Sequence, residues 1–137
     1  MYLDRATSYA MIAMVAVHDH ERQSKHPVTI QQIAETTGIP LEYLRKIVRQ
    51  LVRASVLVSI RGRNGGVKID RNPQDISLRE IIEAIGERLD APCLLDSWPN
   101  PQHPKIDLAR YKDCCDKTRE TIRNLYETTT LADIVNN

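Results

Sequence analysis

Residues 56–69 read Val-Leu-Val-Ser-Ile-Arg-Gly-Arg-Asn-Gly-Gly-Val-Lys-Ile, and this stretch decides the fold of the chain. Two runs rich in β-branched residues, Val56–Ile60 and Val67–Ile69, flank a polar segment that contains Asn64-Gly65. Asn-Gly between two such runs is a strong signal for a β-hairpin, because both residues tolerate the positive φ angles of a tight turn. The stretch predicts a two-stranded wing with a tip made of arginine, asparagine and glycine.

The segment before this hairpin predicts two short helices. Thr29 and Gln32 fit a capping box that opens the first helix, which Gly38 ends. Pro40 suits the first turn of the second helix, which presents one apolar side. That side consists of Leu41, Leu44, Ile47, Val48 and Leu51. Two helices joined by so short a turn are typical of a helix-turn-helix.

Other helices flank this unit. Apolar spacing predicts an amphipathic helix over residues 4–20, and a capping box at Ser77 and Glu80 begins a helix that ends near Gly86. After a proline-rich loop, a long helix is expected over about residues 107–127, with apolar positions in alternating steps of three and four. These positions are Leu108, Tyr111, Cys115, Thr118, Ile122 and Leu125. Such a seam predicts pairing with a second copy of the chain.

The expected fold class is mainly α, a winged helix-turn-helix with a two-stranded β wing and a long C-terminal dimerisation helix. We expect residues 1–86 to form the DNA-binding domain, 87–106 a sensor loop, and 107–137 the dimerisation helix and tail. No apolar run approaches membrane-spanning length and no signal-peptide pattern is present, so a soluble cytoplasmic protein is expected. An enzyme is disfavoured, because the glycine-rich segment 62–66 lacks the Lys-Ser/Thr of a phosphate-binding loop.

Charge divides the chain into two halves. Residues 1–72 carry 11 Lys/Arg and 6 Asp/Glu, a net charge of +5, whereas residues 73–137 carry 8 and 12, a net charge of −4. Residues 45–71 alone hold eight cationic side chains and one carboxylate, Asp70. This asymmetry indicates that the first half faces a polyanion, and double-stranded DNA is the expected partner.

The candidate DNA-binding residues follow from this placement. The second helix of a helix-turn-helix presents its exposed N-terminal side chains to base edges, and a glycine-rich wing tip lets the backbone and its arginines approach phosphates or the minor groove. The set is Thr29, Glu42, Tyr43, Arg45, Lys46, Arg49, Arg61, Arg63, Asn64, Gly65 and Gly66. Tyr43 has an alternative place in the core.

Several motifs together resemble the winged-helix transcriptional regulators of the IscR/NsrR/CymR type, the iron–sulfur cluster regulator superfamily. The motifs are Tyr9-Ala10 with Ala13-Met14, Ile33-Ala34 with Gly38-Ile39, Tyr43-Leu44 with Leu51, the wing over 58–66, and Thr129 to Val135. The resemblance spans nearly the whole chain. The resemblance implies a homodimeric transcription factor that reads a palindromic operator, and it assigns the DNA-contacting role of the wing most directly to Arg61. We expect the regulation to be repression.

The cysteines depart from the pattern of this group. Cluster-binding relatives place three cysteines in the loop and the start of the dimer helix, whereas this chain has Cys93 in the loop and the adjacent pair Cys114-Cys115 in the helix. With His103 as a further ligand, a [2Fe–2S] cluster remains an option, because imidazole replaces thiolate in some such sites. A thiol–disulfide switch between Cys93 and Cys114, or no sensing role, are the alternatives.

The function expected is therefore transcriptional regulation in response to redox, iron–sulfur or nitrosative signals through Cys93, Cys114 and Cys115. Two rival interpretations remain open, a winged helix that binds another protein and a cofactor-free thiol-switch regulator. The salt dependence of DNA affinity separates the first rival from a DNA-binding protein.

Overall fold

The structure is a computed structural model that describes residues 4–87, 89 and 108–136. Cys93 and His103, both candidate ligands, lie outside these residues. The helices are α1 (Arg5–Gln23), α2 (Ile30–Thr37), α3 (Leu41–Arg53), α4 (Leu78–Ala84), α5 (Leu108–Thr128) and α6 (Leu131–Val135). The strands are β1 (Val58–Ile60) and β2 (Gly66–Lys68), and a 3-10 turn, η1 (Pro73–Asp75), precedes α4. The predicted mainly α fold with a two-stranded wing is confirmed.

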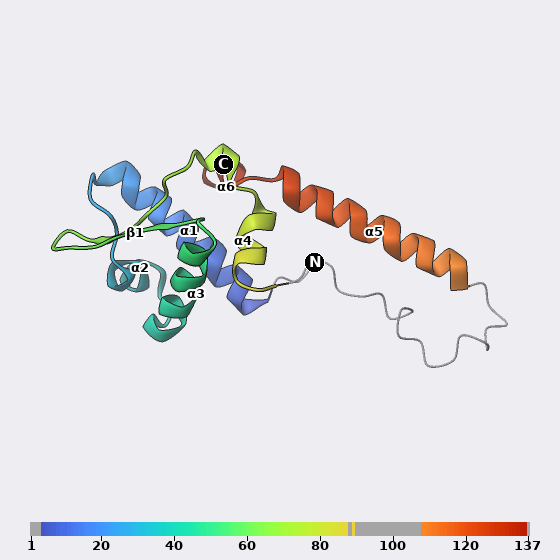
Figure 1. Ribbon diagram of the computed structural model, residues 1–137, viewed down its shortest axis with the longest axis horizontal. Coiled ribbons are helices and arrows are strands. Elements are labelled where there is room, and N and C mark those ends of the chain that lie inside the picture. The colour runs from blue at the N-terminus through green and yellow to red at the C-terminus, as the bar shows by residue number, and fades with distance from the viewer. Residues whose placement is uncertain (1–3, 88, 90–107, 137) are drawn as a thin grey trace.

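Helix α1 lies at the centre of what we call the body, residues 4–87 together with α6 (Figure 1). It begins at Asp4, whose carboxylate accepts a hydrogen bond from the Thr7 amide at 2.7 Å, and it runs to Gln23, three residues beyond the predicted end. Its inward side carries Ala10, Ala13, Met14 and Val17, all fully buried. The two alanines let neighbouring helices approach closely, and α2, α3, α4 and α6 all pack on α1.

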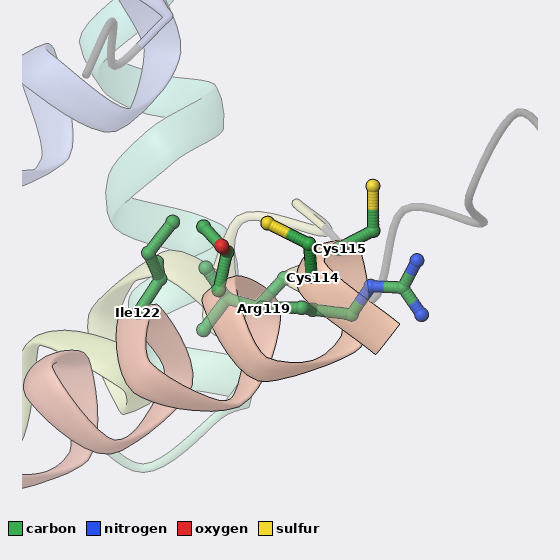
Figure 2. Close-up of a pocket in the computed structure, with 6 residues that line it drawn as sticks. Cys114, Cys115, Arg119 and Ile122 are labelled. Carbon is green, nitrogen blue, oxygen red and sulfur yellow. The ribbon is translucent and has the colours of Figure 1, made fainter. Parts of the chain in front are cut away.

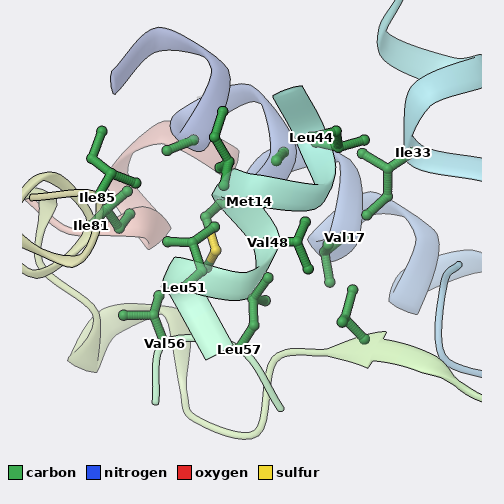
Figure 3. Packing of buried hydrophobic residues seen from close by; sticks show 14 of the residues in the cluster. Met14, Val17, Ile33, Leu44, Val48, Leu51, Val56, Leu57, Ile81 and Ile85 are labelled. Carbon is green, nitrogen blue, oxygen red and sulfur yellow. The ribbon is translucent and has the colours of Figure 1, made fainter. Parts of the chain in front are cut away.

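The core of the body is aliphatic, as the absence of phenylalanine requires. Figure 3 shows Leu44, Val48 and Leu51 projecting from α3 into the space beside Met14 and Val17 of α1. Each of these side chains is at most 2% exposed. Burying a side chain of this size stabilises the fold by about 1.5–3 kcal/mol, so this contact fixes how α3 is presented to solvent.

The helix-turn-helix forms as its local sequence predicts. Thr29 accepts from the Gln32 amide at 3.1 Å and the Gln32 side chain accepts from the Thr29 amide at 2.9 Å, which confirms the capping box. Gly38 ends α2 with a φ of 72°, a left-handed conformation that glycine adopts without strain. Pro40 is the N-cap of α3, one position before the first helical turn.

The hairpin is confirmed, but its turn lies one residue earlier than Asn64-Gly65. Strand β1 pairs antiparallel with β2 in the register Val58 to Lys68 and Ile60 to Gly66. The Gly65 amide donates to the Gly62 carbonyl at 3.0 Å, so the central residues of the turn are Arg63 and Asn64. The strands are shorter than the predicted runs, because Val56 and Leu57 are buried and their amides bond to the Leu51 carbonyl at the end of α3.

The C-terminal segment returns to the body beside α4. The predicted capping box is present, with Ser77 accepting from the Glu80 amide at 3.1 Å, and the predicted staple residues Ile76 and Ile81 are fully buried. The Leu131 amide donates to the Ile76 carbonyl at 2.8 Å, and Leu131 is fully buried. These contacts fix α6 to the rest of the body.

Helix α5 projects from the body, joined to it at its C-terminal end (Figure 1). Its exposed surface includes large apolar side chains, with Tyr111 56%, Ile122 38% and Leu125 60% exposed. Tyr126 is the one buried residue among the positions of this helix. Over the described ranges, none of the helices combines the length and apolarity that crossing a bilayer demands.

Candidate nucleic-acid interface

The outer face of α3 is a compact charged surface. At about 100° per residue, its exposed polar positions fall within an arc of about 100°, opposite the buried side. These positions are Glu42, Arg45, Lys46, Arg49 and Arg53, all exposed. The Glu42 carboxylate reaches one of these cations, Arg45, at 4.0 Å. Four of the five side chains are cationic, so the face is suited to a polyanion.

Tyr43 lies on the surface and not in the core. Its side chain is 54% exposed, and its ring meets the ring of Tyr9 on α1 edge-on, with centroids 6.1 Å apart and planes at 73°. This T-shaped contact is a favourable arrangement for two aromatic rings. It orients Tyr43 at the N-terminal end of α3, next to the exposed charged face.

The glycines of the wing are required by the wing's own packing. A Cβ atom on Gly65 would lie 2.4 Å from the Ile60 carbonyl oxygen, and one on Gly66 would lie 2.4 Å from the Val28 carbonyl oxygen. Real Cβ atoms do not approach oxygen so closely, so neither position accepts another residue without a shift of the backbone. Packing within the chain therefore requires these glycines, in addition to the predicted close approach of the backbone to DNA.

A groove of about 890 Å³ lies between α3, the wing and the start of α2. It brings together parts of the chain that sequence spacing alone does not place side by side. The arginines that line it are Arg45, Arg49, Arg53 and Arg61. No acidic residue is among its lining residues in the part of the chain that the structure covers. Four guanidinium groups with no carboxylate among the described lining residues give this groove a positive charge that suits an anion.

The structure brings six of the eleven predicted DNA-binding residues to one groove, which further residues also line. Thr29, Gly65 and Gly66 line the same groove as the arginines, and Arg63 and Asn64 form the exposed wing tip. Gln31 and Ser59 also line the groove and were missed. Their signals were weak: Gln31 stands two residues after a helix cap, and Ser59 is the polar residue between two apolar strand positions.

Two cations of the basic run are engaged elsewhere. Lys68 pairs with Asp70 at 2.9 Å. Arg71 donates to both carboxylate oxygens of Glu80, at 2.6 and 3.2 Å, and so joins the chain after the wing to α4. The hydrogen bond from Arg71 lowers the pKa of Glu80 below its ordinary value. These two side chains are engaged in ion pairs, whereas four of the remaining arginines line the groove and Arg63 lies at the wing tip.

The predicted seam of α5 forms one continuous face. Leu108 and Cys115 are half-buried, and Tyr111, Thr118, Ile122 and Leu125 are exposed. Cys115, Thr118 and Ile122 also line an apolar cleft of about 310 Å³ together with Leu89, Cys114 and Arg119 (Figure 2). The face therefore continues into a hollow beside the two cysteines.

The cysteine pair alone does not make a metal site. Successive residues of a helix are turned by about 100°, and Figure 2 shows the two sulfur atoms pointing in different directions. Within residues 4–87, 89 and 108–136, no group of three His, Cys, Asp or Glu side chains is placed to hold a metal ion. An iron–sulfur cluster takes four protein ligands, so Cys114 and Cys115 supply at most half of them.

The fold and the groove define a winged-helix DNA-binding protein, and comparison with known proteins identifies the family. The profile of the Rrf2 family, described as iron-dependent transcriptional regulators, matches residues 3–137. The chain belongs to the Rrf2 family of transcriptional regulators, which bind DNA and are not enzymes.

Relatives agree with this assignment, and a solved structure shares the fold. An rrf2-like HTH-type transcriptional regulator of Rhodobacter capsulatus is 33% identical over 120 residues, covering 86% of this chain and 74% of the relative. The HTH-type transcriptional regulator IscR of Vibrio atlanticus is 35% identical over 91 residues, 66% of this chain and 51% of its own length. The structure of CymR, the global cysteine regulator of B. subtilis, superimposes with a TM-score of 0.76 at 20% identity, covering 99% of this chain and 97% of CymR.

Proposed function

We propose that this protein is a homodimeric, sequence-specific DNA-binding regulator that represses transcription from a palindromic operator in the cytoplasm. The observation that carries the proposal is the groove between α3 and the wing, with four arginines and no carboxylate among its lining residues. Residues 1–86 serve DNA binding, 87–106 sensing and 107–137 dimerisation in this proposal.

Each part of the surface takes a distinct role on the duplex. Arg45, near the start of α3, is assigned to a guanine edge in the major groove, and Glu42 is assigned to cytosine N4. Lys46, Arg49 and Arg53 on the same face are assigned to phosphates, which fix register without reading sequence. At the wing, Arg61 and Arg63 are assigned to the minor groove or its phosphates, where a narrow groove attracts guanidinium groups.

The dimer is supported by the exposed seam of α5. Ile122 and Leu125 present apolar surface on one side of a helix that projects from the body. A two-fold dimer through such a seam presents two copies of α3 to DNA. The half-sites of the operator are then expected to be about one helical turn of DNA apart, or a multiple of it.

The effector is proposed to act through Cys93, Cys114 and Cys115. In one form of the proposal these residues, with His103, hold a [2Fe–2S] cluster; in the other, Cys93 and Cys114 form a redox-sensitive thiol pair. Support comes from the family description, iron-dependent transcriptional regulation, and from the exposure of Cys114 at the edge of an apolar cleft.

Selection from a randomised pool of DNA duplexes tests the DNA-binding proposal. Wild-type protein is expected to enrich a palindrome, and its affinity is expected to fall steeply with salt because phosphate binding releases counterions. Arg61→Ala is expected to weaken binding to the enriched duplex by about tenfold, since a hydrogen bond to a charged group is worth about 1.5–3 kcal/mol. Lys117→Ala on α5, which removes the same charge far from the groove, should stay close to wild type.

The same experiment separates the rivals. Failure to enrich any sequence, together with a DNA affinity that does not depend on salt, would overturn the DNA-binding proposal and leave the protein-binding module as the rival to test. Unchanged affinity of Arg61→Ala would remove only Arg61 from the surface.

The cluster is tested by the visible absorption spectrum and the iron and sulfide content of protein purified without oxygen. Bands between about 300 and 600 nm with about two irons per chain are expected for a [2Fe–2S] cluster. Replacing Cys93, His103, Cys114 and Cys115 singly by alanine then assigns the ligands. Colourless, iron-free protein after anoxic reconstitution would leave the thiol pair, which predicts that an oxidant changes DNA affinity in wild type and not in Cys114→Ser.

A further inference from the structure

The base of the wing is held by a side chain from the first helix. Glu21, in the last turn of α1, accepts a hydrogen bond from the Ile69 amide through Oε1 at 2.7 Å, across 48 residues of sequence. Ile69 directly follows β2, where the hairpin ladder has ended. Both residues are partly buried. A carboxylate on a main-chain amide is a charge-assisted bond, one of the stronger hydrogen bonds of a protein.

The wing depends on such outside contacts for its orientation. Its strands pair over only three positions each, so the ladder fixes the two strands to each other but not to the body. A first anchor is the backbone pair between Val28 and Val67, with N–H to O=C distances of 3.0 and 2.8 Å. On the other strand, the Val56 and Leu57 amides tie the chain before β1 to the Leu51 carbonyl of α3. Glu21 adds an anchor two residues beyond Val67, so both strands are tied to the body at the base of the wing.

Small tilts at this base become large displacements at the tip. Arg63 and Asn64 lie about five residues beyond the anchors, about 16 Å along a strand. A tilt of about 10° moves the tip by about 3 Å, the whole length of a hydrogen bond. The helix that carries Glu21 packs directly on α3, so the bond to Ile69 relates the wing to the same element that presents Arg45 and Arg49.

We propose that Glu21 is a positioning residue for DNA recognition: its bond to the Ile69 amide sets the angle between the wing and α3, so that Arg61 and the arginines of α3 meet one duplex in register. The inference rests on the proposed DNA-binding function. Glu21 itself does not contact DNA in this proposal, and its negative charge opposes DNA binding slightly. Its contribution is therefore to specificity.

Two substitutions separate the reach of the side chain from its charge. Glu21→Gln keeps an oxygen at the same distance from the Ile69 amide and removes the charge. Glu21→Asp keeps the charge and withdraws the oxygen by one carbon–carbon bond. Glu21→Ala removes both. Asp19→Asn, two residues away on the exposed side of α1, measures the effect of deleting one negative charge without touching the wing.

Affinity is measured for the duplex that wild type enriches from a randomised pool and for the unselected pool, and their ratio gives specificity. Glu21→Ala and Glu21→Asp are expected to lower this ratio about tenfold, the loss of one charged hydrogen bond, while Glu21→Gln keeps it within about twofold. Amide hydrogen exchange gives the structural readout: Ile69 should exchange faster in the alanine and aspartate variants, while Val67, bonded to Val28, stays protected.

The opposite order, with aspartate like wild type and glutamine like alanine, would assign Glu21 an electrostatic role and overturn the inference. The inference would also be overturned if all three Glu21 variants kept the specificity ratio of wild type while Arg61→Ala bound weakly. Should Glu21→Ala not fold, the glutamine and aspartate pair decides the question alone. If wild type enriches no sequence, the proposed function fails, whereas the exchange rate of Ile69 still reports the anchor separately.

Discussion

The body and α5 use the same kind of residue in opposite ways. In the body, Leu44, Leu51 and Leu131 are fully buried within one chain. On α5, Leu125 and Tyr111 are more than half exposed. Exposed apolar stripes on a helix are characteristic of surfaces that another element covers. The comparison teaches that the core of the body is complete in one copy of the chain, whereas the seam of α5 calls for a second surface.

The largest expected effect comes from the same truncation made in the two regions. Leu51→Ala should lower the free energy of unfolding by about 2–5 kcal/mol, because it leaves a cavity in the core. Leu125→Ala, measured at a protein concentration where the chain is monomeric, should change it by less than about 0.5 kcal/mol. Urea unfolding followed by circular dichroism measures both. A similar loss for the two variants would contradict the division between body and α5.

Self-association, unlike the free energy of unfolding, is expected to depend on Leu125. Leu125→Glu places a charge in the seam and should weaken dimerisation at least about 100-fold, equivalent to about 2.7 kcal/mol, because an unpaired charge would be buried. Asn124→Glu adds the same charge one residue away, turned by about 100° from Leu125 and outside the seam, and serves as the control. Sedimentation equilibrium gives the dissociation constants. Equal dimerisation of the two variants would place the interface elsewhere.

DNA affinity is expected to distinguish the body from α5 when a cationic side chain is removed from each. Arg49→Ala in the groove should weaken binding to unselected duplex DNA several-fold and lower the slope of log K against log salt by about 1, as the loss of one phosphate contact does. Arg119→Ala on α5 should leave the slope unchanged. Fluorescence anisotropy titrations at several salt concentrations measure the slope. A reduced slope for Arg119→Ala instead would extend the DNA surface onto α5.

The smallest effect concerns ion pairs and pH. The pKa of Glu80 is lowered by the hydrogen bond from Arg71, so the unfolded chain takes up this proton first as pH falls. The pair therefore stabilises the body above the ordinary pKa of a glutamate, and the contribution is lost as pH falls through the lowered pKa. Both side chains are more than a third exposed, which limits the contribution to about 1 kcal/mol or less.

Glu80→Gln isolates this contribution, because glutamine preserves the capping box at Ser77. The variant should be slightly less stable than wild type near neutral pH and equal to it at acidic pH. Asp113→Asn, which breaks the exposed pair with Lys117 on α5, should be neutral at both pH values. Thermal unfolding across the pH range checks this; a constant difference for Glu80→Gln would show that the charge is not the cause.

The elements of the body were predictable because each depends on chemistry a few residues long. The capping boxes at Thr29 and Ser77, the hairpin signal and the spacing of Leu44 and Leu51 all act locally, and each is confirmed. The basic run over residues 45–71 was less informative, because the sequence alone does not distinguish Arg71 from the arginines that line the groove. Its partner, Glu80, is nine positions further along, and only the packing of α4 brings them together.

The contacts that assemble the candidate site were not predictable for the same reason. The pairing of Val28 with Val67 and the bond from Ile69 to Glu21 join segments about 40 to 50 residues apart, and no residue type signals them. Tyr43 shows the limit on a single residue: its spacing allowed a place in the core, and the edge contact with Tyr9 keeps it on the surface.

The attachment of α5 at one end makes this helix a lever. Its root is fixed where the Leu78 amide donates to the Thr129 carbonyl at 2.9 Å and Ser77 pairs with Thr130. Cys115 stands about 20 Å from that root and Leu108 about 30 Å, so a rotation of about 10° moves them by about 3 and 5 Å. Because the two distances from the root differ by a factor of about five, the same force produces about five times more torque on the root at Leu108 than at Leu125. A small force at the N-terminal end of α5 therefore has the largest turning effect on α4 and the body.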